Sequence, residues 1–469
     1  MPRSLVASSI VIFMTFVCAS TASSQAQSLE QQGQRLKAIE APKPAAMPNV
    51  TQVPTAAEWT EISETLPGIG IVGTMTFHEF MRRVEASNLA LAAQRYNIPI
   101  AKALLVASRV YPDPQLQVGG GGDITGQGQV NTIGAEFNQT ILLGGKIAAR
   151  EDVTRATLKS TDAAIADYLR ALQAQAANAF VDGIIGILKL KREYKGLERS
   201  HQLVKLNAQR FKNGEISEDE LLRTRIAELE AHSDLFDSQS ALHQTLRGLI
   251  GFMGIHQSQE LIAPAGNLEQ PPREFSLDQL TSSAIANRSD VVEARYALES
   301  ARALYRLARA DRIPDPTFGA EYNHFTEVTN PIDPSPTWDA LGASLNVPIP
   351  LSNLNHGKLD AAYYHLLQSQ KALQAAQLQA EIDVRTAYEH YRLAVTGTRE
   401  FGRELLNDAD NLYKSKLFKL QKGRINLIEI LDTHQALDQL YMDYYNALKR
   451  QAQALVNLEQ AAGTWVIDF

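Results

Sequence analysis

The stretch Ile313-Pro314-Asp315-Pro316-Thr317-Phe318-Gly319-Ala320-Glu321-Tyr322 decides the fold, because one kind of structure ends in it and another begins. Proline lacks a backbone N–H and restricts the residue before it, so the Pro-Asp-Pro motif stops the helical pattern that precedes it. The same change occurs 202 residues earlier (314 − 112), where Pro112-Asp113-Pro114 ends a helical pattern and a strand-like run follows. This recurrence predicts one unit, a helix followed by a β-hairpin, that is present twice.

Two further pairs of motifs support the internal repeat. Gly145-Lys146 and Gly357-Lys358 follow the two hairpins at an offset of 212 (357 − 145). Gly214-Glu215-Ile216 and Gly423-Arg424-Ile425 interrupt long helical stretches at an offset of 209 (423 − 214). Near-constant offsets in the same order indicate a duplicated unit.

Long helices dominate both copies. Residues 146–212 contain no proline and few glycines, and as one helix they would be about 100 Å long. The apolar residues that recur in steps of three and four are Ala163, Ile165, Ala166, Leu169, Leu172, Ala176, Ala177, Phe180 and Ile184. This spacing predicts helices packed side by side. An ordinary coiled coil is the alternative, and the flanking hairpins count against it. The predicted fold is mainly α with a small β part, with repeats at residues 76–270 and 271–469.

The strand-like runs lie at 115–122, 130–142, 317–327 and 338–349 and alternate apolar and polar residues. Period-2 alternation places each set on one face of a sheet. A polar face toward a water-filled lumen and an apolar face toward lipid would fit a membrane barrel, and a soluble sandwich would fit equally well. The candidate lipid-facing residues are Ile133, Phe137, Leu341 and Leu345.

Four strands cannot close a membrane barrel, which needs at least eight. Open sheet edges in lipid would leave backbone groups without hydrogen bonds. If these strands span a membrane, several chains must therefore share one barrel, and a trimer would supply twelve strands.

The N-terminal residues indicate export. Residues 1–26 have one basic residue, an apolar core and a small-x-small end, which is typical of a cleaved signal peptide; a short membrane anchor is the alternative. Cys18, the single cysteine, lies in that segment, so cleavage leaves a mature chain with no thiol. The alternative is that Cys18 is a lipoprotein cysteine that carries the lipid. The formal charge is −7, and −8 once Arg3 is removed, which gives no reason to expect nucleic-acid binding. Residues 27–75 are predicted to form an extended, proline-containing leader.

Enzyme chemistry has little support. The ten histidines include no His-x-x-x-His pair, and neither a phosphate-binding glycine loop nor a Gly-x-Ser-x-Gly motif is present. No catalytic residue, bound cofactor or resident metal is expected. Apart from the signal segment, no run of 18 consecutive apolar residues predicts a transmembrane helix.

With these motifs in order, residues from about 76 to 462 resemble the TolC-like outer-membrane efflux protein family. The resemblance rests on the doubled helix–Pro-Asp-Pro–hairpin units and on the two helix-breaking turns, residues 211–217 and 418–426. It implies a homotrimer with a twelve-stranded barrel in outer-membrane lipid and a tunnel of twelve helices in the periplasm. It also implies two partners, a periplasmic adaptor protein and a proton-driven inner-membrane pump.

The same resemblance places the two turns at the inner tip of the tunnel. The candidate adaptor contacts are then Gly214, Ile216, Ser217, Gly423, Ile425 and Asn426. The acidic residues Glu215, Glu218 and Asp219 would either ring the entrance and favour cations, or simply stabilise the start of a helix.

Residues 347–351, followed by Asn353 and Asn355-His356-Gly357, resemble the cobalt-zinc-cadmium resistance branch, which exports metal cations. The segment also makes sense as the end of a strand and a turn. Two rival functions remain open: an outer-membrane channel for type I protein secretion, and a soluble periplasmic helical scaffold.

Overall fold

The computed structural model describes residues 70–122, 132–255, 261–326, 336–349, 356–467 and 469. The chain divides into two compact units, Met1–Val50 and Thr51–Phe469, and the first lies wholly outside the described residues. The predicted signal peptide, most of the predicted leader, and residues 350–355 of the motif assigned to the metal branch also lie outside them.

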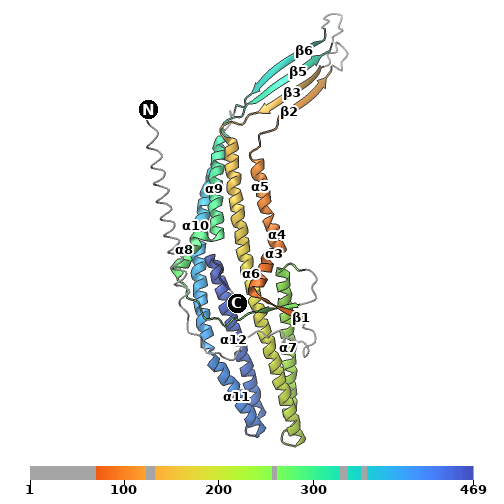
Figure 1. Cartoon of the computed structure of the whole chain (residues 1–469), viewed down its shortest axis with the longest axis vertical. Helices are drawn as coiled ribbons and strands as arrows, with labels where there is room; N and C mark the ends of the chain where they lie inside the picture. The colour runs from red at the N-terminus through yellow and green to blue at the C-terminus, as the bar shows by residue number, and fades with distance from the viewer. Residues whose placement is uncertain (1–69, 123–131, 256–260, 327–335, 350–355, 468) are drawn as a thin grey trace, which may run out of the picture. The chain divides into compact units, whose positions relative to one another are not determined.

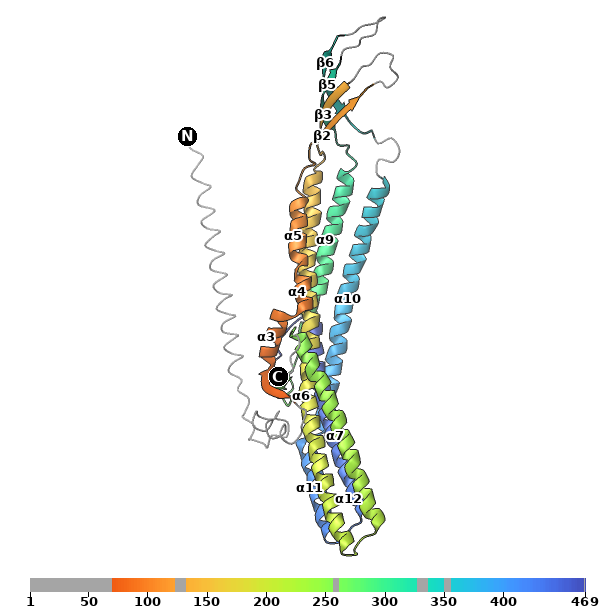
Figure 2. The ribbon, with the colours of Figure 1, turned by 90° about the vertical axis from the view of Figure 1, so that its right-hand side faces the viewer.

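The second unit is mostly helical, with a four-stranded sheet at one end (Figures 1 and 2). At the other end lie the two turns that connect α6 with α7 and α11 with α12. The helices are α3 (Phe77–Ser87), α4 (Leu89–Arg95), α5 (Asn97–Ala107), α6 (Lys146–Lys212), α7 (Glu218–Phe252), α8 (Leu277–Asn287), α9 (Ser289–Ala310), α10 (His356–Glu400), α11 (Arg403–Gln421) and α12 (Leu427–Ala462). The strands are β1 (Ile71–Thr76), β2 (Gln115–Gly121), β3 (Thr132–Thr140), β4 (Leu261–Ala265), β5 (Thr317–Phe325) and β6 (Trp338–Asn346).

The four longer strands form an antiparallel sheet in the order β2-β3-β5-β6. The two hairpins are joined at their inner strands, where Glu136 faces Glu321 and Phe137 faces Ala320. β2 and β6 are therefore the edges of the sheet. The short strands β1 and β4, which the sequence analysis did not predict, pair in parallel beside the helices.

The helix α6 is 67 residues long and has the bounds that the sequence predicts. Its middle is the core of the unit: Phe180 is fully buried, with the rings of Phe77 and Phe80 at 5.3 and 5.4 Å. An 18-residue window of α6 reaches a mean hydropathy of 1.2, enough in length and composition to cross a membrane, but 61% of that window is buried inside the protein. Its apolar character is explained by packing between helices.

The helical stretches are interrupted at several points. The sequence predicts a break near Pro99, and the first stretch is interrupted at Asn88 and again at Tyr96, three residues before Pro99. Pro99 itself lies in the first turn of α5, where a missing N–H costs nothing. The stretch before Pro314 is split at Arg288, and the stretch before Lys422 is split before Arg403. Thr76-Phe77-His78-Glu79 has the sequence of a capped helix start, and the Thr76 hydroxyl accepts from the Glu79 N–H at 3.4 Å.

The Pro-Asp-Pro motif at residues 314–316 joins the start of β5 to the segment that leads from β3 into α6. Lys146, only 4% exposed, donates from Nζ to the Asp315 carboxylate at 2.7 Å and to the Ile313 carbonyl at 2.5 Å. The other Asp315 oxygen accepts the Leu143 N–H at 2.8 Å. Proline on either side fixes the backbone that presents this carboxylate.

Candidate functional site

The two turns at the tip of the helices have the same construction. Gly214 (φ 73°) and Gly423 (φ 64°) adopt the left-handed conformation that ends a helix. The residue after each glycine donates its N–H to a carbonyl five residues earlier, Glu215 to Arg210 and Arg424 to Lys419, both at 2.9 Å. Three residues after each glycine, a side chain caps the next helix: Ser217 accepts from Glu220 N–H at 3.3 Å, and Asn426 accepts from Glu429 N–H at 2.9 Å.

The candidate adaptor contacts therefore lie on these two adjacent turns. Gly214, Ser217, Gly423 and Asn426 are exposed, and Ile216 and Ile425 are half-buried. The exposed backbone and caps leave both turns available to a partner at the end of the helices.

The two turns differ in charge. Residues 210–220 carry two basic and four acidic side chains, a net charge of −2, whereas the equivalent residues 419–429 carry three basic and one acidic side chain, a net charge of +2. Glu215 lies 3.4 Å from Arg210, and Glu218 and Asp219 are exposed in the first turn of α7. Acidic side chains in that position stabilise a helix start.

One face of the four-stranded sheet is apolar and exposed. Ile133 and Phe137 are 61% and 48% exposed, and Leu341 and Leu345 are 86% and 60% exposed. The strand register places all four on the same face, together with Leu116, Val118, Phe318 and Tyr322, which are also exposed. The opposite face carries polar residues, among them Glu136, Asn138, Glu321, Asn323 and Ser344.

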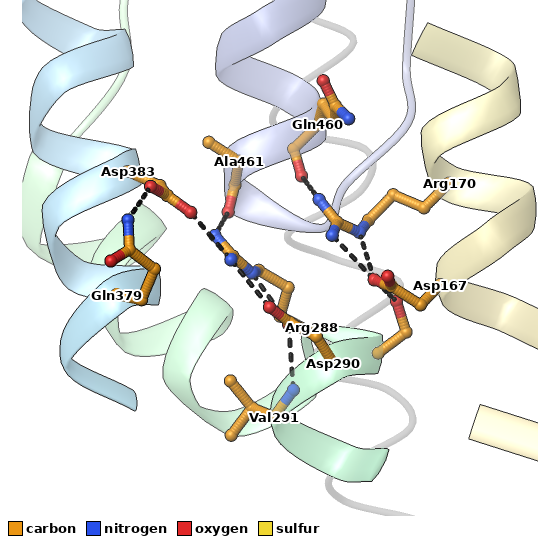
Figure 3. Close-up of polar contacts among 10 residues, drawn as sticks. Asp167, Arg170, Arg288, Asp290, Val291, Gln379, Asp383, Gln460 and Ala461 are labelled. Carbon is orange, nitrogen blue, oxygen red and sulfur yellow. Dashed lines mark hydrogen bonds and ion pairs between the residues drawn. The ribbon is translucent and has the colours of Figure 1, made fainter. Parts of the chain in front are cut away.

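A junction of charged side chains lies where the C-terminus of α12 meets the N-terminus of α9 (Figure 3). Arg288, 4% exposed, donates to the Ala461 carbonyl at 3.3 Å and to Asp290 and Asp383 at 2.7 and 2.8 Å. Arg170 of α6 donates to the Gln460 carbonyl at 2.8 Å. Cations at these carbonyls compensate the negative end of the helix dipole.

The pKa of Asp290 reflects its place in this junction. Burial alone would raise the pKa, but the hydrogen bonds and charge of Arg288 hold it below its usual range. The carboxylate therefore stays ionised and keeps Arg288 oriented toward α12.

An equivalent junction lies in the first copy. Asn88 separates α3 from α4, as Arg288 separates α8 from α9, and its amide donates to the Phe252 carbonyl at the end of α7 at 3.0 Å. The two positions are 200 residues apart (288 − 88), close to the offset of the Pro-Asp-Pro motifs.

A second buried cluster links α6 with α12 between this junction and the tip. Asp438 accepts from Arg192 Nε at 2.7 Å and from Arg199 at 2.8 Å, and lies 3.0 Å from His434 Nδ1. Burial lowers the pKa of His434 despite the neighbouring carboxylate. The Arg192 guanidinium also lies 3.8 Å above the Tyr441 ring.

The carboxyl of Glu193 belongs to the same level of α6. Burial raises its pKa to about 7, and Asp234 of α7 and Asp438 of α12 add to the effect, while Arg192 and Arg199 oppose it. Ionising Glu193 therefore costs free energy in the folded state.

A groove of about 840 Å³ lies between α10 and α12 beside the junction of Figure 3. Arg170, Arg288, Asp383, His390 and Arg450 contribute charged or titratable groups to its lining. In the residues that the structure describes, no group of three or more His, Cys, Asp or Glu side chains could hold a metal ion.

Sequence reasoning missed both ionic clusters. Arginines in an amphipathic helix are usually solvated. In the Asp438 cluster the two arginines lie 246 and 239 residues from the carboxylate, so local spacing holds no sign of that cluster. In the junction, Asp290 lies two residues from Arg288, but the Ala461 carbonyl lies 173 residues away. The one available sign was the offset that relates Asn88 to Arg288.

The chain is similar to known proteins over most of its length. The model of a family described as outer membrane efflux protein matches residues 280–464. The cobalt-zinc-cadmium resistance protein CzcC of Cupriavidus metallidurans is 20% identical over 391 residues, which is 83% of this chain and 90% of that protein.

Solved structures show the same fold. A structure of CusC has a TM-score of 0.67 at 16% identity, covering 91% of this chain and 99% of CusC. The outer membrane protein VceC of Vibrio cholerae has a TM-score of 0.65 at 14% identity, covering 82% and 96%. The open state of the Neisseria gonorrhoeae MtrE outer membrane channel has a TM-score of 0.65 at 16% identity, covering 82% and 88%.

Replacing Glu193 with glutamine should stabilise the protein at pH 8 and have little effect at pH 5. Between the ordinary pKa near 4.5 and the folded value of about 7, the folded state binds more protons, so wild-type stability falls as pH rises. Because Glu193 is partly solvated, we expect a gain of about 3 °C in Tm at pH 8. Thermal unfolding followed by circular dichroism measures it, with the exposed Glu198→Gln as control. An equal shift at both pH values would contradict this assignment.

Proposed function

We propose, because this chain belongs to the outer membrane efflux protein family, that three copies form the outer-membrane duct of a tripartite efflux system. The single observation that carries the proposal is a four-stranded sheet with one exposed apolar face at the end of a helical bundle whose longest helix, α6, is about 100 Å long. The duct is passive, and the energy for export comes from an inner-membrane pump coupled through a periplasmic adaptor protein.

The sheet supplies one third of a membrane barrel. Strands β3, β5 and β6 are nine residues long, close to the length of a tilted membrane strand. The exposed face with Ile133, Phe137, Leu341 and Leu345 meets lipid, and the face with Glu136 and Glu321 meets water in the lumen.

The open edges of the chain require other copies. β2 and β6 have free hydrogen-bonding groups, and lipid offers no partner for them. Head-to-tail association of β6 with β2 of the next copy closes twelve strands after three chains. The helices continue the same seam: exposed apolar side chains lie on α5 at one side (Ile100, Leu104) and on α10 at the other (Tyr364, Leu378).

The two copies of the unit, residues 76–270 and 271–469, derive from a duplication. The matched turns at Gly214 and Gly423 and the matched junctions at Asn88 and Arg288 support this reading. A duplicated chain in a trimer gives a ring of six similar units.

The tip of the helices is the docking site for the adaptor, and the six turn residues named above are its contacts. Their position at the end opposite to the sheet supports the assignment (Figure 1). Glu215, Glu218 and Asp219 lie beside them and make the first turn acidic. This holds both if they favour cations at the entrance and if they only stabilise the start of α7.

The cargo is heavy-metal cations. This part of the proposal is supported by the similarity to a protein named for cobalt, zinc and cadmium resistance. A channel for secreted polypeptides would have the same wall, because a conduit need not recognise what the pump has selected.

Deleting the gene should lower the host's tolerance of cobalt, zinc or cadmium salts several-fold, because the pump then lacks an exit. Growth inhibition by metals, drugs and dyes measures the profile, and the intact gene on a plasmid is the control. Loss of one secreted protein, with unchanged tolerance of all small solutes, would assign the duct to polypeptides instead.

Leu341→Arg should prevent stable insertion, since a charge on the lipid face near the bilayer midplane costs about 2–4 kcal/mol. The readout is heat-sensitive gel mobility of trimers in outer-membrane fractions. Ser344→Arg, on the opposite face of the same strand, is the matched control and should insert. A soluble wild-type protein recovered from the periplasm would favour the scaffold instead.

Ile425→Asp at the tip should reduce metal tolerance to the level of the deletion while leaving the trimer intact, because it places a charge in the adaptor contact. Tolerance and trimer recovery are measured together. Lys205→Asp, exposed on α6 above the turn, should keep tolerance. Full tolerance in the Ile425 variant would remove this residue from the docking surface.

A further inference from the structure

Lys146, Asp315 and the Ile313 carbonyl form a contact between the two hairpins, called the joint below. A buried lysine that follows a Gly residue, Lys146, reaches an aspartate between two prolines, Asp315, at 2.7 Å. The lysine also donates to the carbonyl of Ile313, and the backbone continues the joint through the Ile141 N–H and the Pro316 carbonyl at 2.9 Å. This joint lies where the first hairpin meets the second, next to the β3–β5 pair.

Both partners of the joint have a counterpart in the other copy. Lys358 follows Gly357 as Lys146 follows Gly145, and Asp113 stands between Pro112 and Pro114 as Asp315 stands between its two prolines. The backbone carbonyl that accepts from the lysine has a counterpart too, because Tyr111 precedes Pro112 as Ile313 precedes Pro314.

The counterparts are unpaired within the part of the chain that the structure describes. Asp113 and Lys358 are both exposed, and among the described residues neither makes an ion pair or a side-chain hydrogen bond. By contrast, the side chain of Lys146 is 5% exposed in its ion pair. A lysine and an aspartate that are paired in one setting are thus both unpaired in the other.

Their positions in the fold explain the difference. Asp113 lies just before β2, which is one edge of the sheet, and Lys358 lies in the first turn of α10, after β6, which is the other edge. Within one chain they are at opposite sides and cannot meet. In a closed ring, β6 of one copy lies beside β2 of the next, in the relation that β3 has to β5 inside the chain.

We infer that Lys358 of one copy forms an ion pair with Asp113 of the next copy and donates to its Tyr111 carbonyl, repeating the Lys146–Asp315 joint between chains. The inference rests on the proposed ring of three chains and adds the residues that close it. Three such pairs between chains and three within chains would then form a belt of six joints below the barrel.

The joint also fixes the order of the chains. The interface joins two different surfaces, so each copy offers its aspartate on one side and its lysine on the other. Opposite charges at the two sides favour head-to-tail contact and disfavour contact of like sides. The apolar side chains of α5 and α10 lie on the same two sides and would be buried together.

Charge exchange tests the pair. Asp113→Lys and Lys358→Asp, introduced singly, should each reduce the yield of trimers at least tenfold, since each leaves like charges in a partly buried joint. The double exchange in one chain should restore most of the yield, because every joint then regains opposite charges. Exchanging the exposed Arg306 and Asp152, which are paired between α9 and α6 within the chain and lie on neither α5 nor α10, is the matched control and should leave trimers unchanged.

Cross-linking gives an independent reading. The chain has one native cysteine, Cys18, so cysteines at 113 and 358 can be joined selectively by a short bifunctional thiol reagent. We expect dimer and trimer bands on denaturing gels from this pair, and only monomers from cysteines at 146 and 315, which are joined within one chain.

The outcomes separate this inference from the proposed function. Trimers that form normally in both single variants, with no cross-linked bands, would overturn the Lys358–Asp113 pair and leave the duct standing. A wild-type chain that forms no oligomer in the outer membrane would overturn the ring itself and, with it, the pair.

Discussion

Unpaired backbone groups at the two edges of one small sheet are the constraint on which the rest of the structure depends. β2 and β6 each end the hydrogen-bonded ladder, and four strands are too few to curl back on themselves. In water such edges could be hydrated, but exposing the apolar face beside them to water is unfavourable. These open edges are the ground for the proposal that copies of the chain complete the sheet.

Ionic contacts fix the helices at the points where one element gives way to another. Lys146 holds the first hairpin to the second, Arg288 joins the end of α12 to the start of α9, and Asp438 ties α12 to α6. Buried pairs of this kind add little net stability over apolar packing, but they are costly to break singly and so define one arrangement. Helices of this length need such points, because packing along a uniform stripe would tolerate sliding.

Local rules predicted the elements of the fold well. Proline and glycine mark the ends of α6 and both hairpins, and the bounds of α6 agree with the sequence pattern to the residue. A glycine, Gly402, also marks the break before Arg403. Neither proline nor glycine marks the break at Arg288, whose partner, the carbonyl of Ala461, lies far away in the chain. The alternation of apolar and polar residues predicted the two faces of the strands. It could not say whether the apolar face meets lipid, and that proposal rests on the open edges of the sheet.

The proposed copies of the unit share backbone geometry at equivalent positions but differ there in side-chain chemistry. Gly214 and Gly423 end their helices in the same way, yet one turn carries a net charge of −2 and the other +2. Asn88 and Arg288 occupy equivalent junctions, but only the arginine is charged. The proposed trimer would therefore have six similar wall units around its axis but only threefold chemical symmetry, and its tip would present acidic and basic turns in alternation. A partner that docks there would meet an acidic turn and a basic turn, and a partner with charged contact residues could distinguish the two.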